Sequence, residues 1–301
     1  MGLLGALDQV NPRVDDFDVH LLNAVGIASP RHIDDDIGER DVLRVVALVR
    51  AAIAPEPWPA DRAALDRIRD YLAASAAHHL DLPAPTDAGA FLNNIHKQVD
   101  SARLNDLRLA VFHDINTQDW LRPAYFATAR DSVQTLIGNE LAMQKRINLS
   151  VQMPDDDKSV LPVHADVWSG DSAFEAVLWV PFVDVFASKS MFIASPAKNA
   201  EIVTRFKDFN GRSAEDLYRE VEASLTFLEI PYGHVLVFNQ NLMHGNRVNR
   251  EAETRWSMNC RFKSVLSPYA DKKLGEFFEP ITLRAMTRIG MDFALPDDFT
   301  E

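Results

Sequence analysis

The chain contains a single cysteine, Cys260, among 301 residues. One thiol can form neither an internal disulfide nor a thiolate metal site with a second cysteine, so a disulfide-stapled fold and cysteine-rich zinc sites are excluded. We interpret Cys260 as a small buried apolar residue.

Long apolar runs and a positive net charge are also lacking. No run approaches the roughly 18 residues of a membrane-spanning helix, and Met1 to Leu7 is too short for a secretory apolar region before Asp8. Acidic side chains number 44 against 31 basic ones, a formal charge of -13 that repels anionic membranes and nucleic-acid phosphates. We therefore expect a cytoplasmic protein with a neutral or cationic small-molecule substrate, without a nucleic-acid or membrane partner. The oligomeric state is not predicted.

The first 140 residues are predicted to be mainly helical. Apolar residues recur at helical spacing over 41–54 and 60–77, and prolines follow both segments. A further helix is predicted over 123–137, ended by Gly138.

From residue 141 the apolar period changes to that of strands. Strict alternation of apolar and polar residues over 147–153 indicates a strand with one polar face. Further short strands are predicted at 163–168, 174–183, 190–195, 234–239 and 254–264. We expect one α+β domain over 1–301 with a mainly β core, a double-stranded β-helix (a cupin-like jelly roll) covered by the N-terminal helical layer. The core spans 141–265, a helical insertion 200–225 opens with a capping box at Ser213 and Asp216, and 266–301 is a C-terminal extension.

The triplet H-x-D occurs three times and is therefore weak evidence of a metal site by itself. The triplet at 32–34 lies in a polar connection, and that at 79–81 ends a helical pattern, where residues two apart point to different sides. His164 and Asp166 instead lie in a predicted strand, where residues two apart share a face at about 6 to 7 Å. Only this pair is predicted to converge on one ion.

A later predicted strand ends in His244 and supplies a third ligand. Two neutral imidazoles and one carboxylate form the facial triad of non-haem iron(II) oxygenases, which leaves coordination positions for a bidentate 2-oxo acid and dioxygen. Structural zinc is less favoured because it prefers closed sites, although ligands alone do not fix the metal. We expect Fe(II) with 2-oxoglutarate as co-substrate.

The far carboxylate of 2-oxoglutarate needs a cation, and an arginine fork pairs with it bidentately. Arg247 and Arg250 fall in a polar loop and are interpreted as solvent-facing charges. Arg255 opens an alternating strand and shares a polar face with Ser257, so we predict Arg255 as the clamp and Ser257 as its hydrogen-bonding neighbour.

Together these segments resemble the phytanoyl-CoA dioxygenase-like (PhyH) branch of the Fe(II)/2-oxoglutarate oxygenases. The similarity covers about residues 134–263 and rests on five features in order: H-A-D (164–166), A-V-L-W-V-P-F (176–182), G-H-V-L-V-F (233–238), H-G-N (244–246) and Arg255. It implies a dioxygenase that couples oxidative decarboxylation of 2-oxoglutarate to succinate and CO2 with hydroxylation, or a related C-H oxidation, of a substrate. It also implies iron ligation by His164, Asp166 and His244, and co-substrate binding by Arg255.

The resemblance further places Trp179 and Asn246 at the co-substrate, although the family often has serine at the position of Asn246. Because Asp166 is retained, hydroxylation is favoured over halogenation. We expect a small polar metabolite as substrate, with a carbohydrate or a sugar-containing natural product ranked first. Two alternatives stay open: a cupin-type metal enzyme that needs no 2-oxo acid, and a non-catalytic jelly-roll binding protein.

Several other side chains have two interpretations each. Trp168 either stacks on a substrate ring or closes the barrel. The polar face with Asn148 and Gln152 lines a wet cavity, which would make Asn148 a co-substrate contact and Gln152 a substrate contact, or it faces solvent. His234 is predicted to be structural. The polar residues of 91–98 either cap the pocket or form a solvated helix face.

Overall fold

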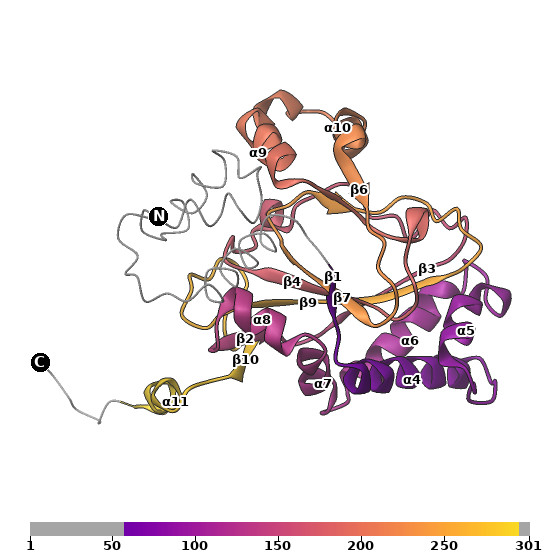
Figure 1. Ribbon diagram of the computed structural model, residues 1–301, viewed down its shortest axis with the longest axis horizontal. Helices are drawn as coiled ribbons and strands as arrows, with labels where there is room; N and C mark the ends of the chain where they lie inside the picture. The colour runs from indigo at the N-terminus through magenta and orange to yellow at the C-terminus, as the bar shows by residue number, and fades with distance from the viewer. Residues whose placement is uncertain (1–56, 295–301) are drawn as a thin grey trace, which may run out of the picture. The chain divides into compact units, whose positions relative to one another are not determined.

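Helices form the first part of the chain that the structure describes. The computed structural model describes residues 57–294 (Figure 1), so the predictions for 41–54 and for the triplet at 32–34 lie outside the described residues. The helices before the first long strands are α4 (Arg62–His79), α5 (Ala88–Asn93), η2 (Ile95–Lys97), α6 (Leu104–Asn116), α7 (Leu121–Ala127) and α8 (Arg130–Ile137).

The helix predicted over 60–77 is confirmed as α4, and Asp61 caps it by accepting a hydrogen bond from the Ala64 amide. The single helix predicted over 123–137 is wrong, because the chain forms α7 and α8 with a break at Thr128 and Ala129. The Thr128 hydroxyl donates to the Tyr125 carbonyl at 2.7 Å, and the Thr128 carbonyl accepts from the Asp61 amide. Local side-chain bonding of this kind competes with continued helix.

The larger sheet has seven strands, and each strand pairs antiparallel with its neighbours. The order is β1-β7-β4-β9-β2-β10, and β3 pairs with the first half of β9 while β2 pairs with its end. The strands are β1 (Pro57–Pro59), β2 (Leu141–Gln144), β3 (Asn148–Gln152), β4 (Ala176–Pro181), β7 (His234–Asn239), β9 (Arg255–Ser264) and β10 (Phe278–Thr282). The predicted strands at 147–153, 174–183, 234–239 and 254–264 are confirmed.

The two faces of this sheet have different neighbours. Leu178 and Val180 of β4 pack into the cluster formed with the helices α4 to α7, whereas Val177 and Trp179 pack with Ile193 on the other face. The same alternation divides β9: Trp256, Met258, Cys260 and Phe262 belong to the helical cluster. Cys260 is thus a buried core residue, as predicted.

A smaller sheet of three strands packs against the second face of the larger one. It consists of β5 (Phe192–Ala194), β6 (Leu225–Phe227) and β8 (His244–Gly245) in the order β6-β5-β8. The insertion between β5 and β6 contains α9 (Pro196–Thr204), η5 (Phe206–Phe209), α10 (Ala214–Val221) and η6 (Glu222–Ser224). Its two α-helices pack on β5 and β6 and lie beside β6 in Figure 1. The predicted capping box at Ser213 and Asp216 is confirmed.

The strand predicted over 163–168 is wrong. His164 makes only an isolated antiparallel bridge to His244, and residues Asp166–Ser169 form a short 3-10 helix, η3. The left-handed Gly170, with a φ of 86°, ends this helix. A second 3-10 helix, η4 (Ala187–Lys189), leads into β5, and α11 (Ala285–Asp292) follows β10. None of the helices within 57–294 is long and apolar enough to cross a bilayer.

Candidate metal and co-substrate site

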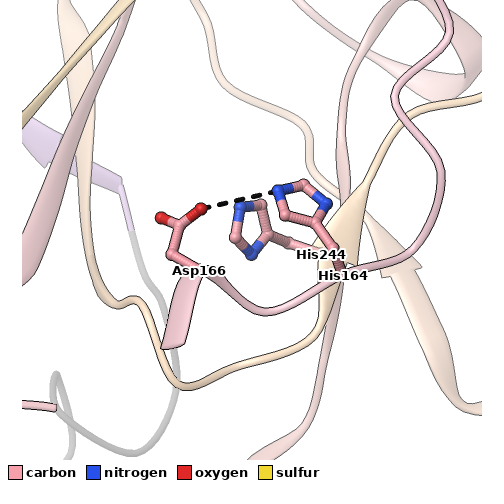
Figure 2. Close-up of side chains that lie close together, drawn as sticks. All are labelled: His164, Asp166 and His244. Atoms are coloured by element: carbon pink, nitrogen blue, oxygen red, sulfur yellow. Dashed lines mark ion pairs between the residues drawn. The ribbon is translucent and has the colours of Figure 1, made fainter. Parts of the chain in front are cut away.

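Three of the predicted side chains lie together between the two sheets. The candidate ligand atoms of His164, Asp166 and His244 all lie within 4.8 Å of one another, and His164 Nε2 is 3.5 Å from Asp166 Oδ1 (Figure 2). A side chain from a loop, one from η3 and one from β8 therefore converge on a single point.

Backbone pairing sets the two histidines side by side. The His164 amide donates to the His244 carbonyl at 3.0 Å, and the His244 amide returns the bond at 2.8 Å. On its other edge β8 pairs with β5, which places Ile193 opposite His244. This pairing brings the imidazole centroids to 4.3 Å.

The proton positions of both imidazoles follow from their hydrogen bonds. His164 Nδ1 lies 2.9 Å from the Pro162 carbonyl, and His244 Nδ1 lies 2.8 Å from the Leu242 carbonyl. A carbonyl only accepts, so each Nδ1 carries a proton, and each Nε2 has a lone pair whenever its ring is neutral. Histidines that bind metals are commonly oriented in this way.

Burial and neighbouring charges set the protonation states of the three side chains. Burial, together with the nearby His164, lowers the pKa of His244 to about 4, so this imidazole is neutral at pH 7. Burial raises the pKa of Asp166, but the His164 hydrogen bond and the Arg261 charge outweigh it and bring the pKa to about 2. For His164, burial lowers the pKa while the Asp166 hydrogen bond raises it, and the net shift is upward. The site thus offers one carboxylate and at least one neutral imidazole.

The three side chains form one wall of a cavity of about 280 Å³. Arg255 lines the same cavity and is 3% exposed. Its guanidinium donates to the Ser190 carbonyl at 3.2 Å and to Ser150 Oγ at 3.1 Å, but within residues 57–294 no acidic side chain pairs with it. Burial lowers the pKa of Arg255 to about 10, so it remains a cation.

Arg255, the serine whose carbonyl it contacts and the serine two positions further along β9 all have buried polar atoms without partners. Among the described residues, Arg255 Nε, Ser190 Oγ and Ser257 Oγ are all buried and have no hydrogen-bond partner. A buried donor left unpaired carries a penalty of about 1–3 kcal/mol, so such a group is suited to a ligand that supplies the missing acceptor.

Of the other residues predicted at the co-substrate, three line the cavity. Trp179 of β4 is 5% exposed there, and Asn148 of β3 donates to Asn259 Oδ1 at 2.8 Å. Asn246 also lines it, but its amide is used by the backbone: Oδ1 accepts from the Leu161 amide and Nδ2 donates to the Ser159 carbonyl. Asn246 therefore holds the 159–161 loop beside the cavity.

Three predicted residues do not line the cavity. Ser257 is fully buried within the sheet, and Gln152 is fully buried with its amide donating to the Arg247 carbonyl at 2.5 Å. Trp168 is 38% exposed and stacks on Phe206 of the insertion at 4.8 Å between centroids. A 3-10 helix has three residues per turn, so Trp168 and Asp166, two apart on η3, point to different sides.

The remaining candidates have local partners. Arg247 pairs with Glu215 at 2.6 Å, and Arg250, 67% exposed, pairs with Asp155. His234 lies half-buried at the start of β7. In the segment 91–98, the His96 ring contacts Thr254 and Asn93 accepts from buried Lys189, so this segment packs on the loop before Arg255.

Two residues that contact Asp166, Arg261 and Gln240, have no role predicted from the sequence. Arg261 Nη2 lies 3.2 Å from Asp166 Oδ1, and its Nε donates to Gln240 Oε1 at 3.2 Å. The signal for Arg261 was present, because it shares the polar face of β9 with Arg255. Gln240, in the turn after β7, carries no pattern that would single it out.

No family model and no curated protein match the chain. Solved structures that resemble it include a non-haem monooxygenase, ThoJ, as its nickel complex, with 16% identity, 76% of this chain and 80% of that chain covered and a TM-score of 0.49. HygX from Streptomyces hygroscopicus, with nickel and 2-oxoglutarate bound, has 13% identity, 79% and 90% coverage and a TM-score of 0.44. SnoN, a non-haem α-ketoglutarate-dependent epimerase from nogalamycin biosynthesis, has 16% identity, 76% and 85% coverage and a TM-score of 0.42. All three TM-scores are below 0.5.

Proposed function

We propose that the protein is an Fe(II)/2-oxoglutarate-dependent dioxygenase with a jelly-roll core formed by the two sheets. His164, Asp166 and His244 hold the iron, and Arg255 holds the far carboxylate of 2-oxoglutarate. The observation that carries the proposal is a buried arginine that has no acidic partner among the described residues. It lies in the same cavity as a cluster of two histidines and one carboxylate.

The donor set fits this metal. Two imidazoles with free Nε2 atoms and one carboxylate can occupy one face of an octahedral ion and leave three positions for ligands. Iron in such a site supplies the activation of dioxygen that organic side chains cannot provide. The chain's own residues set the geometry: Pro162 and Leu242 carbonyls fix the rings, and Arg261 contacts the carboxylate.

The remaining cavity wall fits the co-substrate. A carboxylate beside Arg255 would receive a charge-assisted hydrogen bond from the guanidinium, and Ser150 Oγ lies close enough to contribute a second donor. Trp179 and Phe238 also line the cavity and give it apolar surface. The side chains thus bind, orient and desolvate 2-oxoglutarate.

The proposed reaction consumes one dioxygen, one 2-oxoglutarate and one substrate C-H bond. One oxygen atom goes to succinate, released together with CO2, and the other goes to the hydroxylated product. Asn148 and Asn259 give the cavity a polar wall, which favours a small polar metabolite. A carbohydrate or a sugar-containing natural product is our first choice of substrate class.

One alternative, a cupin-type metal enzyme without a 2-oxo acid, predicts no use for Arg255 and would leave its buried guanidinium without an acidic partner. The other, a non-catalytic binding protein, gives no reason for the two-histidine, one-carboxylate cluster in the same cavity as Arg255. Burying a charge without its partner is strongly unfavourable, so Arg255 favours the dioxygenase.

The direct test is anaerobic binding of 2-oxoglutarate to the Fe(II)-loaded protein. We expect a weak visible charge-transfer band, because the 2-oxo acid chelates the iron, and succinate formation when oxygen is admitted. The Arg255→Met variant should bind 2-oxoglutarate about 30-fold or more weakly, since truncating one partner of a buried charge pair costs roughly 2–5 kcal/mol.

Arg247→Met is the matched control, because Arg247 pairs with Glu215 and does not line the cavity. Its affinity for 2-oxoglutarate should stay within a factor of about two of wild type. Absence of the band in wild type would refute the proposed activity, and an unchanged affinity in Arg255→Met would refute the clamp alone.

A further inference from the structure

Asp166 does not lie on a strand, so the sheet does not fix its carboxylate. Its amide donates to the Gln240 carbonyl at 3.1 Å, and its Oδ1 lies 3.2 Å from Arg261 Nη2. The two contacts are joined, because Arg261 Nε donates to the side-chain oxygen of Gln240 at 3.2 Å. Gln240 thus holds the backbone of Asp166, and Arg261, bonded to Gln240, contacts its carboxylate.

Arg261 is itself held from the other side. Its Nη2 lies 3.3 Å from Asp171 Oδ2, and the Asp171 side chain is 1% exposed. Lys272 pairs with the other oxygen of Asp171. Gln240 is fully buried, and its amide donates to the Ser172 carbonyl at 2.5 Å. The guanidinium therefore has three fixed partners and little freedom to turn.

We propose that Arg261 is a positioning residue that orients the Asp166 carboxylate for metal binding, with Gln240 and Asp171 as its supports. The inference rests on the metal site of the proposed function but not on 2-oxoglutarate. Contacts of this kind behind a metal ligand change metal affinity by 10 to 100-fold in other proteins.

A simpler role for Arg261 makes the opposite prediction. If Arg261 only balanced the charges of Asp166 and Asp171, its positive charge would repel a divalent cation, and removing it would strengthen metal binding. Lysine keeps this charge but lacks the planar fork that reaches three partners at once. Arg261→Lys and Arg261→Gln therefore separate orientation from charge.

The test is a calorimetric Co(II) titration of the metal-free full-length chain, with the visible spectrum of the Co(II) complex recorded in parallel. If Arg261 orients Asp166, both variants bind Co(II) roughly 10 to 100-fold more weakly, and their d-d bands differ from wild type because the carboxylate ligand has moved. Unchanged binding in Arg261→Lys with unchanged or tighter binding in Arg261→Gln overturns the proposal.

Stability is checked separately, because losing Arg261 leaves Asp171 buried with Lys272 alone. The double variant Asp171→Asn/Arg261→Gln removes both charges and should keep the melting temperature near that of wild type while still binding Co(II) weakly. Wild-type Co(II) affinity in this double variant also overturns the proposal.

Arg122→Lys is the matched control, since Arg122 likewise joins a carboxylate, Glu279 at 2.9 Å, to backbone carbonyls but does not line the cavity. Its Co(II) affinity should equal that of wild type. If wild type binds Co(II) but not 2-oxoglutarate, the proposed activity fails while this inference is still decided by the Arg261 variants. If wild type does not bind Co(II), both fail.

Discussion

Gly245 occupies a place in the site where no larger residue fits. A Cβ atom built there would lie 2.7 Å from the Leu161 carbonyl oxygen, 2.8 Å from the Phe192 ring and 2.9 Å from the Pro162 carbonyl oxygen. The Pro162 carbonyl also accepts the hydrogen bond from His164 Nδ1. A shift of the backbone at Gly245 would therefore disturb His244 directly and His164 through Pro162.

We expect Gly245→Ala to weaken metal binding and to destabilise the fold. Overpacking against backbone atoms costs typically about 1–3 kcal/mol, and the displaced imidazoles should lower Co(II) affinity at least about tenfold. Urea unfolding and Co(II) titration measure the two effects. Gly290→Ala in α11 is the control, because nothing lies within 4 Å of its added Cβ. Equal Co(II) affinity in wild type and Gly245→Ala would contradict the account.

Residue patterns along single strands predicted some of these contacts. Alternation along β9 correctly separated the face of Arg255 and Arg261 from the core face of Trp256. The contact of Arg261 with Asp166 could not be predicted, because it joins residues 95 positions apart through the fold. The patterns also failed at Gln152. It lies on the polar face of β3, as expected, but it pairs with Arg255 of β9 and its side chain is fully buried.

At the scale of elements, α4 and α6 are joined by a polar cluster as well as by apolar packing. Asp114 on α6 accepts a hydrogen bond from Ser75 and contacts His79 Nε2, both at 2.8 Å. Burial raises the pKa of Asp114, but the contacts with Ser75 and His79 outweigh it and the net shift is downward. His79, the histidine of the second H-x-D triplet, thus contacts a neighbouring helix and not the candidate metal site.

This lowered pKa predicts how stability depends on pH. A carboxyl group with a lower pKa in the folded state contributes stability above its unfolded pKa, here near 3.8, and loses it as pH falls through the folded value. Asp114→Asn should therefore unfold with a free energy about 1 kcal/mol lower than wild type at pH 7, and the difference should shrink below pH 3.8.

Urea unfolding at several pH values measures this difference. Asp70→Asn is the control on the same helix layer, because the Asp70 side chain is 65% exposed and its one ion pair among the described residues is with Arg69, at 3.8 Å. A destabilisation of Asp114→Asn that stays the same from pH 7 to pH 3 would show that the carboxylate charge is not its cause.

Element predictions failed where side chains changed the local backbone. The pattern over 163–168 alternates like a strand, but residues 166–169 form η3. The Asp166 amide donates to the Gln240 carbonyl, and the left-handed Gly170 ends the helix. The predicted helix over 123–137 broke at Thr128 for a similar local reason. Such effects depend on partners that the sequence period does not reveal.

For the described chain as a whole, the candidate site depends on three separate segments of the chain. His164 and Asp166 come from the loop before β4, His244 from the smaller sheet and Arg255 from the larger sheet. The residue patterns predicted most of the elements, a helical layer over a β core and, together with the resemblance, which residues would meet. They did not predict that Asp166 lies on a 3-10 helix and contacts Gln240 and Arg261.

In the proposed site, metal and co-substrate share this cavity, so the two ligands should raise the stability of the whole chain in a fixed order. A ligand at 100 times its dissociation constant stabilises a protein by about 2.7 kcal/mol, and at about 2–4 °C per kcal/mol the melting temperature rises by roughly 5–11 °C. Co(II) alone should raise it. 2-Oxoglutarate should raise it further only when Co(II) is present, because the proposed binding mode needs both Arg255 for one carboxylate and the metal for the 2-oxo acid.

Thermal unfolding of four proteins tests this order at the scale of the whole chain. His244→Ala should lose both increases, because it removes a metal ligand, and Arg255→Met should lose only the increase due to 2-oxoglutarate. His79→Ala should keep both increases, since His79 contacts Asp114 far from the cavity lining. A 2-oxoglutarate effect that is equally large without Co(II), or that persists in Arg255→Met, would place the co-substrate outside this cavity.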